Sequence, residues 1–220
     1  MTADSASINL THHFLIAMPG LEDSAFAKTV VYVCEHNERG ALGLVINKPS
    51  DLSMKGLFDK VDLPLHRQDL MHAFVMQGGP MHTERGFVLH DAIWGGAASQ
   101  AVDATADEAA QEAEALSHIS DKESVYASTM TIPGGLEMTT SKDVLEALSM
   151  GAGPKRVLIS LGYSAWGEGQ LESELAENSW LTVGADPAVI FDTPLEQRYE
   201  RAMQLLGLES WMLSTEVGHS

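Results

Sequence analysis

The sequence predicts an α+β fold: a single domain in which helices flank a mixed, mostly antiparallel β-sheet. Short apolar runs between turn residues outnumber the helical segments that could serve as crossovers between parallel strands. Hydrophobic residues make up 45% of the 220 residues, which is enough for a substantial core. No internal repeat and no long linker divides the chain, so we expect one domain over residues 1–220.

Two neighbouring apolar runs in the first quarter of the chain predict a β-hairpin. Residues 29–34 (TVVYVC) are apolar on both faces, which is typical of a central strand that is covered on both sides. Residues 37–40 (NERG) supply a turn, and residues 41–46 (ALGLVI) form the returning strand. Pro49 closes the hairpin, because proline cannot continue an internal strand.

The other expected elements are short. The remaining apolar runs that we interpret as strands lie at residues 10–17, 74–77, 86–90, 125–132, 136–139, 156–161 and 180–183. The segments with helical signals lie at residues 52–58, 142–150, 169–177 and 195–206. Ser53 or Asp51 is the expected N-cap of the first helix and Ser141 that of the second. Gly162 is expected to end the strand before it.

Residues 95–123 differ in composition from the rest of the chain. They are rich in Ala, Ser, Asp and Glu, and residues 103–116 have helix-forming residues but little apolar face. We therefore interpret this stretch as an acidic insertion, either a solvated helix or a mobile segment.

The charge balance limits the classes of partner. The chain has 31 acidic and 13 basic residues and a formal net charge of −18. Such a surface repels nucleic-acid phosphates and anionic lipids, so we expect neither direct nucleic-acid binding nor a membrane partner. The polar leader lacks the pattern of a secretion signal and no apolar run could span a bilayer, so we expect a cytoplasmic protein.

The sequence lacks the motifs of several common phosphate-binding, zinc and nucleophile sites. The sequence has no phosphate-binding GxxxxGK[ST] loop, no GxGxxG after a strand and no HExxH zinc helix. Residues 162–166 (GYSAW) approach the GxSxG nucleophile pattern, but Trp166 occupies its final glycine position. A single cysteine, Cys34, excludes an intramolecular disulfide. We expect no cofactor.

Four stretches together resemble the YqgE/AlgH family of bacterial proteins. They are residues 14–19 (FLIAMP), 33–36 (VCEH) with 40–47 (GALGLVIN), 78–80 (GGP) with 85–90 (RGFVLH), and 161–172 (LGYSAWGEGQLE). The resemblance covers nearly the whole chain in order, and the acidic stretch at 95–123 departs from it by being longer. It implies one cytoplasmic α/β-containing domain. It implies no defined reaction, although one member's name is linked to the regulation of alginate production.

Cys34, His36 and His90 are the candidates for chemistry. Cys34 and His36 alternate along one expected strand and should therefore share a face, with Cβ atoms about 6.5–7 Å apart. Because this spacing is loose for a direct contact, His90 from a neighbouring strand is the better candidate base for a thiolate. Alternatively, Cys34 is a buried structural thiol and the histidines are hydrogen-bonded at strand ends. A metal site from the three residues lacks a spacing signature, and we expect none.

Loop residues are the candidates for ligand binding. Gly78 and Gly79 could direct backbone N–H groups at an anion, or could only turn the chain tightly. Asn47 could bind a ligand or cap its own turn. Tyr163 and Trp166 supply rigid amphipathic area, and Gln170 begins a helix. Alternatively, Trp166 braces that helix against the sheet.

Three functional hypotheses follow. We favour a ligand-binding or regulatory module without turnover, which would bind an unidentified small molecule or protein in a groove among residues 47–49, 78–80 and 162–170. The first alternative is a cysteine-dependent enzyme or redox sensor that uses Cys34 and a nearby histidine. The second is a protein-interaction scaffold, linked only indirectly to transcriptional regulation, whose acidic stretch meets a basic partner.

Overall fold

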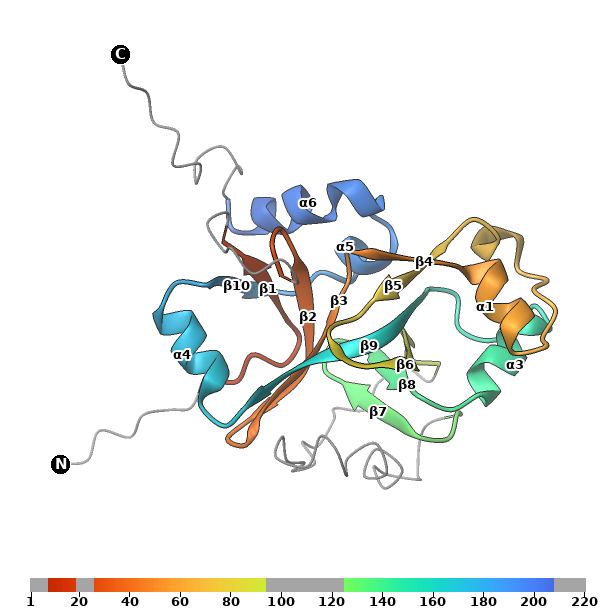
Figure 1. Ribbon diagram of the computed structural model, residues 1–220, viewed down its shortest axis with the longest axis horizontal. Helices are drawn as coiled ribbons and strands as arrows, with labels where there is room; N and C mark the ends of the chain where they lie inside the picture. Colours follow the sequence, from red (N-terminus) through yellow and green to blue (C-terminus); the bar gives the residue numbers. More distant parts are fainter. Residues whose placement is uncertain (1–7, 19–25, 94–124, 208–220) are drawn as a thin grey trace, which may run out of the picture.

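A ten-stranded, mostly antiparallel sheet forms the centre of the computed structural model, which describes residues 8–18, 26–93 and 125–207 (Figure 1). The strands follow the order β10-β1-β2-β3-β9-β6-β8-β7, and β4 and β5 form a branch that pairs with β9. Among the strand pairs in these ranges, only β5 and β9 run parallel. The predicted α+β class with a mixed sheet is therefore confirmed, whereas the acidic stretch at 95–123 lies outside the described residues.

The elements have the following bounds. The strands are β1 His13–Ala17, β2 Val30–Asn37, β3 Gly40–Val45, β4 Pro49–Ser53, β5 Phe74–Gln77, β6 Met81–Asp91, β7 Thr129–Ile132, β8 Leu136–Thr139, β9 Val157–Gly167 and β10 Trp180–Gly184. The helices are α1 Met54–Lys60, α3 Asp143–Ser149, α4 Gln170–Ala176, α5 Pro187–Phe191 and α6 Arg198–Leu205, with 3-10 turns η1 Gln68–Leu70 and η4 Leu195–Gln197.

Strand β9 joins the two halves of the sheet. Its second half pairs with β3 on one edge, its first half pairs with β5 on that same edge, and β6 lies along the other edge. The strand continues through Gly162, so the prediction that it ends there was wrong. Gly162 has a φ of +71°, which lets the backbone bend without leaving the sheet. On either side of Gly162, β9 thus pairs with β5 and with β3.

Three apolar clusters fill the fold. The largest lies inside the curled sheet and contains side chains from near both ends of the strand order, such as Phe14 of β1 and Ile132 of β7, together with side chains of α5 and α6. A second cluster lies between the outer face of β1–β3 and α4. A third lies under α1 and α3. In Figure 1, α4 accordingly lies at one side of the molecule, and α1 and α3 lie at the other.

Several local predictions are confirmed and others are corrected. The β2–β3 hairpin forms as expected, and Ser53 caps α1 by accepting a hydrogen bond from the backbone N–H of Gly56. Ser141 does not cap α3: the hydroxyl of Ser141 donates to the carboxylate of Asp143, and Lys142 occupies the N-cap position. The last predicted helix is divided into η4 and α6, and the sequence reading missed β4 and α5.

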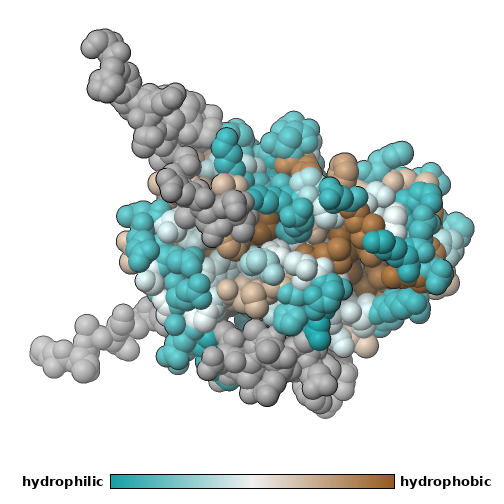
Figure 2. Space-filling view, viewed as in Figure 1, coloured by the Kyte–Doolittle hydropathy of each residue, from teal (hydrophilic) through white to brown (hydrophobic). Residues whose placement is uncertain are grey.

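The surface is mostly hydrophilic in the view of Figure 2, with an apolar area on the side where β4, β5 and α1 lie. Phe74 at the start of β5 is 52% exposed. The helices in the described ranges do not include one with the length and hydrophobicity of a membrane span.

Candidate functional site

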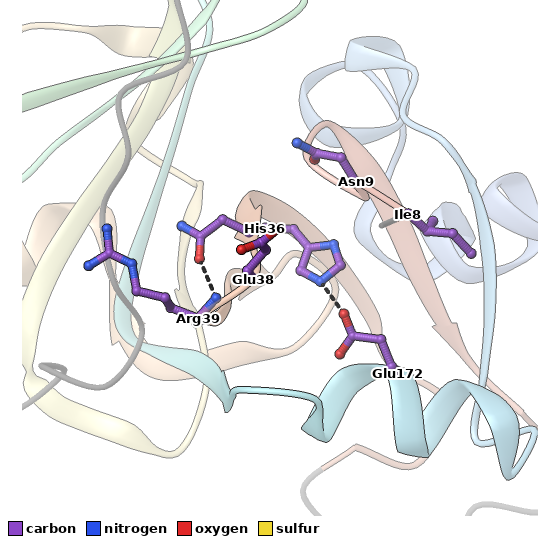
Figure 3. Close-up of a pocket in the computed structure, with 7 residues that line it drawn as sticks. Ile8, Asn9, His36, Glu38, Arg39 and Glu172 are labelled. Carbon is purple, nitrogen blue, oxygen red and sulfur yellow. Dashed lines mark hydrogen bonds and ion pairs between the residues drawn. The ribbon is translucent and has the colours of Figure 1, made fainter. Parts of the chain in front are cut away.

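A pocket of about 550 Å³ lies beside the turn between β2 and β3 (Figure 3). We call it the hairpin pocket. The residues that line it come from the chain before β1, from the hairpin and from α4, and they are Ile8, Asn9, His36, Asn37, Glu38, Arg39 and Glu172. All except Ile8 carry polar side chains, so the pocket suits a polar ligand.

The hairpin turn holds one wall of this pocket in place. Asn37 ends β2, and its side-chain oxygen accepts a hydrogen bond from the backbone N–H of Arg39 at 2.8 Å. Gly40 begins β3 with a φ of +137°, which favours glycine. This Asx turn positions Glu38 and Arg39 at the tip of the hairpin.

His36 and Glu172 form the centre of the hairpin pocket. His36 is buried, and its Nδ1 accepts a hydrogen bond from the backbone N–H of Leu10 at 3.0 Å. Its Nε2 lies 2.9 Å from Oε1 of Glu172, whose side chain is 51% exposed. Because Nδ1 is an acceptor, the ring proton resides on Nε2 and is donated to the carboxylate. His36 therefore orients Glu172 and connects α4 to β2.

A β-bulge places Cys34 and His36 on opposite faces of the sheet. The register of β2 against β3 shifts between Val33 and Glu35. As a result Cys34 lies in the central cluster, whereas His36 pairs with Ala41 and faces the α4 side. The prediction that the two side chains share a face was wrong, because the extra residue of a bulge inverts the alternation beyond it.

Cys34 is buried among apolar side chains of the central cluster. Its Sγ donates a weak hydrogen bond to the carbonyl of Tyr32 at 3.8 Å. Burial, and to a smaller extent the nearby charge of Glu35, raises the pKa of the Cys34 thiol above its usual range. A protonated and inaccessible thiol is a poor nucleophile, so this environment favours the structural alternative for Cys34.

His90 does not contact Cys34. Strands β3 and β9 lie between β2 and β6, and both ring nitrogens of His90 have other partners. Nδ1 donates to the carbonyl of Asp91 at 2.9 Å, and Nε2 lies 3.0 Å from Oγ1 of Thr139. The expected pairing of His90 with the thiol was therefore wrong. Among the described residues, no group of three or more His, Cys, Asp or Glu could hold a metal ion.

Gly78 and Gly79 allow two backbones to touch. A Cβ atom on Gly78 would lie 2.2 Å from the carbonyl oxygen of Gly162, and one on Gly79 would lie 2.2 Å from the carbonyl carbon of Tyr163. The N–H of Gly78 donates to the carbonyl of Leu161 at 2.8 Å. Since this N–H is already bound, the geometry favours the close-packing interpretation over an anion site.

Asn47, which follows β3, is hydrogen-bonded to the backbone at the start of β2. Its side-chain oxygen accepts from the N–H of Val30 at 2.8 Å, and its side-chain nitrogen donates to the carbonyl of Lys28 at 2.9 Å. Where we expected a groove among residues 47–49, 78–80 and 162–170, the N–H of Gln77 donates to the carbonyl of Lys48, and Gly78 packs directly against the carbonyl of Gly162. These contacts are packed backbone, which leaves Asn47 with a bracing role.

Tyr163 and Trp166 face opposite sides of β9. Tyr163 lies in the central cluster, whereas Trp166 lies in the α4 cluster, so the two do not form the single recognition surface that we expected. Trp166 is buried, and its indole N–H donates to Oε2 of Glu174 at 2.9 Å. Gln170 donates to the other oxygen of Glu174 at 3.0 Å. This agrees with the alternative in which Trp166 braces α4.

Sequence reasoning identified His36 but missed the rest of the hairpin pocket. Glu172 is 136 positions from His36, and nothing in the spacing of α4 predicts that contact. From the sequence, Glu38 and Arg39 were predicted only to form part of a turn. The one available signal was that four of the lining residues are consecutive polar positions at a hairpin turn, where binding residues often occur.

Comparisons with known proteins agree on one family. A family model described as AlgH-like matches residues 14–211. UPF0301 proteins from Paracidovorax citrulli and Variovorax paradoxus are 70% and 67% identical to this chain, over the full length of both partners. The solution structure of the AlgH protein from Pseudomonas aeruginosa is similar at 41% identity, with a TM-score of 0.66 and 98% of each chain covered. A crystal structure from Corynebacterium diphtheriae, at 18% identity and a TM-score of 0.62, shares the fold over 94% of this chain and 92% of its own.

Proposed function

This chain belongs to the AlgH-like family, and we propose that it is a binding module without turnover whose ligand occupies the hairpin pocket. The observation that carries the proposal is the His36–Glu172 pair, in which a buried ring holds a half-exposed carboxylate at the pocket. Function as a regulator would then follow from binding rather than from chemistry.

The hydrogen bonds of the pocket favour binding over catalysis. The Nδ1 atom of His36 is occupied by the N–H of Leu10, so the ring has no open lone pair with which to accept a proton from a substrate. Cys34 is buried on the other face of the sheet. The residues at the pocket can therefore hold a ligand, and the candidate nucleophile lies away from it.

The charges of the hairpin pocket favour a cationic ligand. Glu172 uses Oε1 to accept from His36, which leaves Oε2 available at the solvent side. Glu38 adds a second, exposed carboxylate, and Arg39 adds one positive charge. Because carboxylates only accept hydrogen bonds, the matching group is a charged N–H donor such as a primary amine. The net charge of −18 attracts such a ligand and disfavours direct nucleic-acid binding.

The proposal is tested by titrating the full chain with putrescine as a cationic probe and glutarate as an anionic probe, followed in ¹H–¹⁵N spectra. Putrescine should shift the amide signals of residues 8–9, 36–39 and 172, and glutarate should not. Glu172→Gln should abolish the shifts while the fold persists. Glu177→Gln, an exposed position that follows α4, is the matched control and should leave them unchanged.

Two results would contradict the proposal. One is an equal response to both probes, which would show that the carboxylates do not select the ligand. The other is a putrescine response that survives Glu172→Gln, or one that lies at a different part of the molecule.

A further inference from the structure

A buried chain of hydrogen bonds connects β6, β8 and β7 next to Tyr126, which belongs to the cluster under α1 and α3. We call it the threonine relay: His90 of β6, Thr139 of β8, Thr129 of β7 and the backbone carbonyl of Tyr126. Nε2 of His90 lies 3.0 Å from Oγ1 of Thr139, which lies 2.6 Å from Oγ1 of Thr129. Thr129 in turn donates to the carbonyl of Tyr126 at 2.9 Å. The three side chains are buried.

With a neutral His90, the relay lacks one hydrogen. Nδ1 of His90 faces a carbonyl, that of Asp91, and must carry the ring proton. Nε2 is then an acceptor and takes the single hydroxyl hydrogen of Thr139. The one hydroxyl hydrogen of Thr129 therefore faces three acceptors: Oγ1 of Thr139, the carbonyl of Tyr126 and, at the longer distance of 3.3 Å, the carbonyl of Ala127. Only one of these contacts can be a full hydrogen bond at a time.

A second proton on His90 removes this conflict. Nε2–H would donate to Thr139, the hydroxyl of Thr139 would donate to Thr129, and Thr129 would donate to Tyr126. Every contact in the relay is then a hydrogen bond that runs in one direction. Glu137 lies beside the ring, with Oε2 3.9 Å from Nδ1, and supplies a counter-charge.

We propose that the threonine relay is a proton-operated switch. When a second proton binds at Nε2 of His90, the hydroxyl of Thr139 rotates to donate to Thr129 instead of Nε2, and the hydroxyl of Thr129 then donates to the carbonyl of Tyr126. The proton comes from solvent and is returned to it, and no covalent bond other than N–H changes. The segment between Tyr126 and Thr129 leads into β7, the last strand of the sheet order, so protonation in the interior changes how firmly that end of the sheet is held.

The surroundings of His90 set the pH range. Besides Glu137 on β8, two carboxylates lie near the relay. Asp91 accepts a hydrogen bond at 2.7 Å from Arg156, which directly precedes β9. Asp143 of α3 accepts a hydrogen bond from the N–H of Ala127. The ring of Tyr126 packs edge-on against His90, with centroids 5.7 Å apart. Burial lowers the pKa of His90 from its ordinary value, and burial also raises the pKa of Glu137. The switch therefore operates below about pH 6.5.

The switch has an unusual signature because its local and global effects oppose each other. A histidine whose pKa is lowered by folding binds its proton more weakly in the folded than in the unfolded chain. The free energy of unfolding therefore decreases as the pH falls below the pKa that the histidine has in the unfolded chain. At the same time, the segment at Tyr126 gains a hydrogen bond. An ordinary buried histidine would show the first effect without the second.

The experiment follows the full chain between pH 7.5 and 4.5 by two measurements. Ring ¹⁵N shifts report the protonation of His90, and backbone amide shifts and hydrogen exchange report residues 126–129. We expect one shared midpoint below about pH 6.5, with exchange in the segment slowing several-fold as His90 becomes charged, after correction for the intrinsic pH dependence of exchange. Exchange that is unchanged or faster at that midpoint would overturn the proposal, as would a His90 that keeps one protonation state throughout.

Matched variants separate the relay from the histidine alone. Thr139→Val removes the hydroxyl at nearly constant volume, so His90 should still titrate while the response at 126–129 is lost. Thr139→Ser keeps the hydroxyl and should restore it. Glu137→Gln removes the counter-charge and should move the midpoint to lower pH. If Thr139→Val retains the response at residues 126–129, the relay does not transmit the protonation of His90. If that variant does not fold, the proposal is decided by whether His90 and residues 126–129 share one midpoint in the wild type and in Thr139→Ser.

Discussion

One oxygen of Glu174 accepts hydrogen bonds from two tryptophans. The indole N–H groups of Trp166 and Trp180 lie 2.9 and 2.7 Å from Oε2, while Oε1 accepts from Gln170. The two indole rings contact each other edge-to-face with centroids 6.0 Å apart. A single side chain on α4 thereby satisfies two buried donors that come from different strands.

Replacement of Glu174 should therefore destabilise the fold. Glu174→Ala leaves both indole N–H groups without their acceptor, and we expect a loss of about 2–4 kcal/mol in the free energy of unfolding, since each unsatisfied donor costs about 1–3 kcal/mol and water partly reaches the site. Urea denaturation followed by tryptophan fluorescence measures this. Glu177→Ala, at an exposed position, is the control and should change stability by less than about 0.5 kcal/mol. Equal effects of the two variants would contradict the assigned role of Glu174.

The environment of Cys34 also leads to a residue-level prediction. Burial raises the pKa of the thiol, and the side chain is only 2% exposed. We expect alkylation in the native protein to be at least about tenfold slower than in urea, with no inflection below about pH 8.5, because labelling requires opening of the structure. A native rate above the denatured rate would instead indicate an activated thiolate.

At the scale of elements, contact between backbones determines how β5 meets β9. The carbonyl of Gly78 accepts hydrogen bonds from Val45 N–H at 2.8 Å and from the Ser164 hydroxyl at 3.3 Å, while its N–H donates to Leu161. One residue thus ties together β3, β5 and β9. Its lack of a side chain is what permits this arrangement, since the carbonyl of Gly162 occupies the space that a Cβ atom would need.

A methyl group at this position should be costly. We expect Gly78→Ala to lower the free energy of unfolding by about 3 kcal/mol or more, because the clash is with rigid backbone rather than with a flexible side chain. Gly86→Ala is the matched control: no atom lies within 4 Å of its built Cβ, and stability should stay within about 1 kcal/mol. Thermal and urea denaturation compare the two. A mild effect of Gly78→Ala would show that β5 can move away from β9 at little cost.

The elements also show what a sequence can and cannot predict. Apolar runs and turn residues correctly indicated the β2–β3 hairpin, β5, β8, β10 and α4, because local periodicity determines such segments. The bulge at Cys34 and the passage of β9 through Gly162 were missed, since each depends on what the neighbouring strand does. The hairpin pocket was missed for the same reason: its histidine and its α4 carboxylate meet only in the folded chain.

At the scale of the whole molecule, charge works against compactness. A net charge of −18 on 220 residues means that acidic groups repel one another across the folded surface. Such long-range repulsion is screened by salt, since the Debye length falls from about 30 Å at about 0.01 M to about 10 Å at 0.1 M ionic strength.

The melting temperature should consequently rise by a few degrees when NaCl is raised from about 10 mM to about 200 mM at neutral pH. The same comparison near pH 4.7, the isoelectric point calculated from the sequence, is the control and should show little change. If salt leaves the melting temperature unchanged at neutral pH, the acidic groups are too far apart or too well paired to destabilise the fold.

The position of β9 in the chain has a consequence for synthesis in the cell. This strand pairs with β3, β5 and β6, yet it is among the last strands to leave the ribosome, since it spans Val157–Gly167. Until then, the nascent polypeptide carries three strand edges without their partner, and such edges are templates for wrong pairing. A polypeptide that is released before residue 157 would therefore be a substrate for chaperones and proteases rather than a smaller working version of the protein.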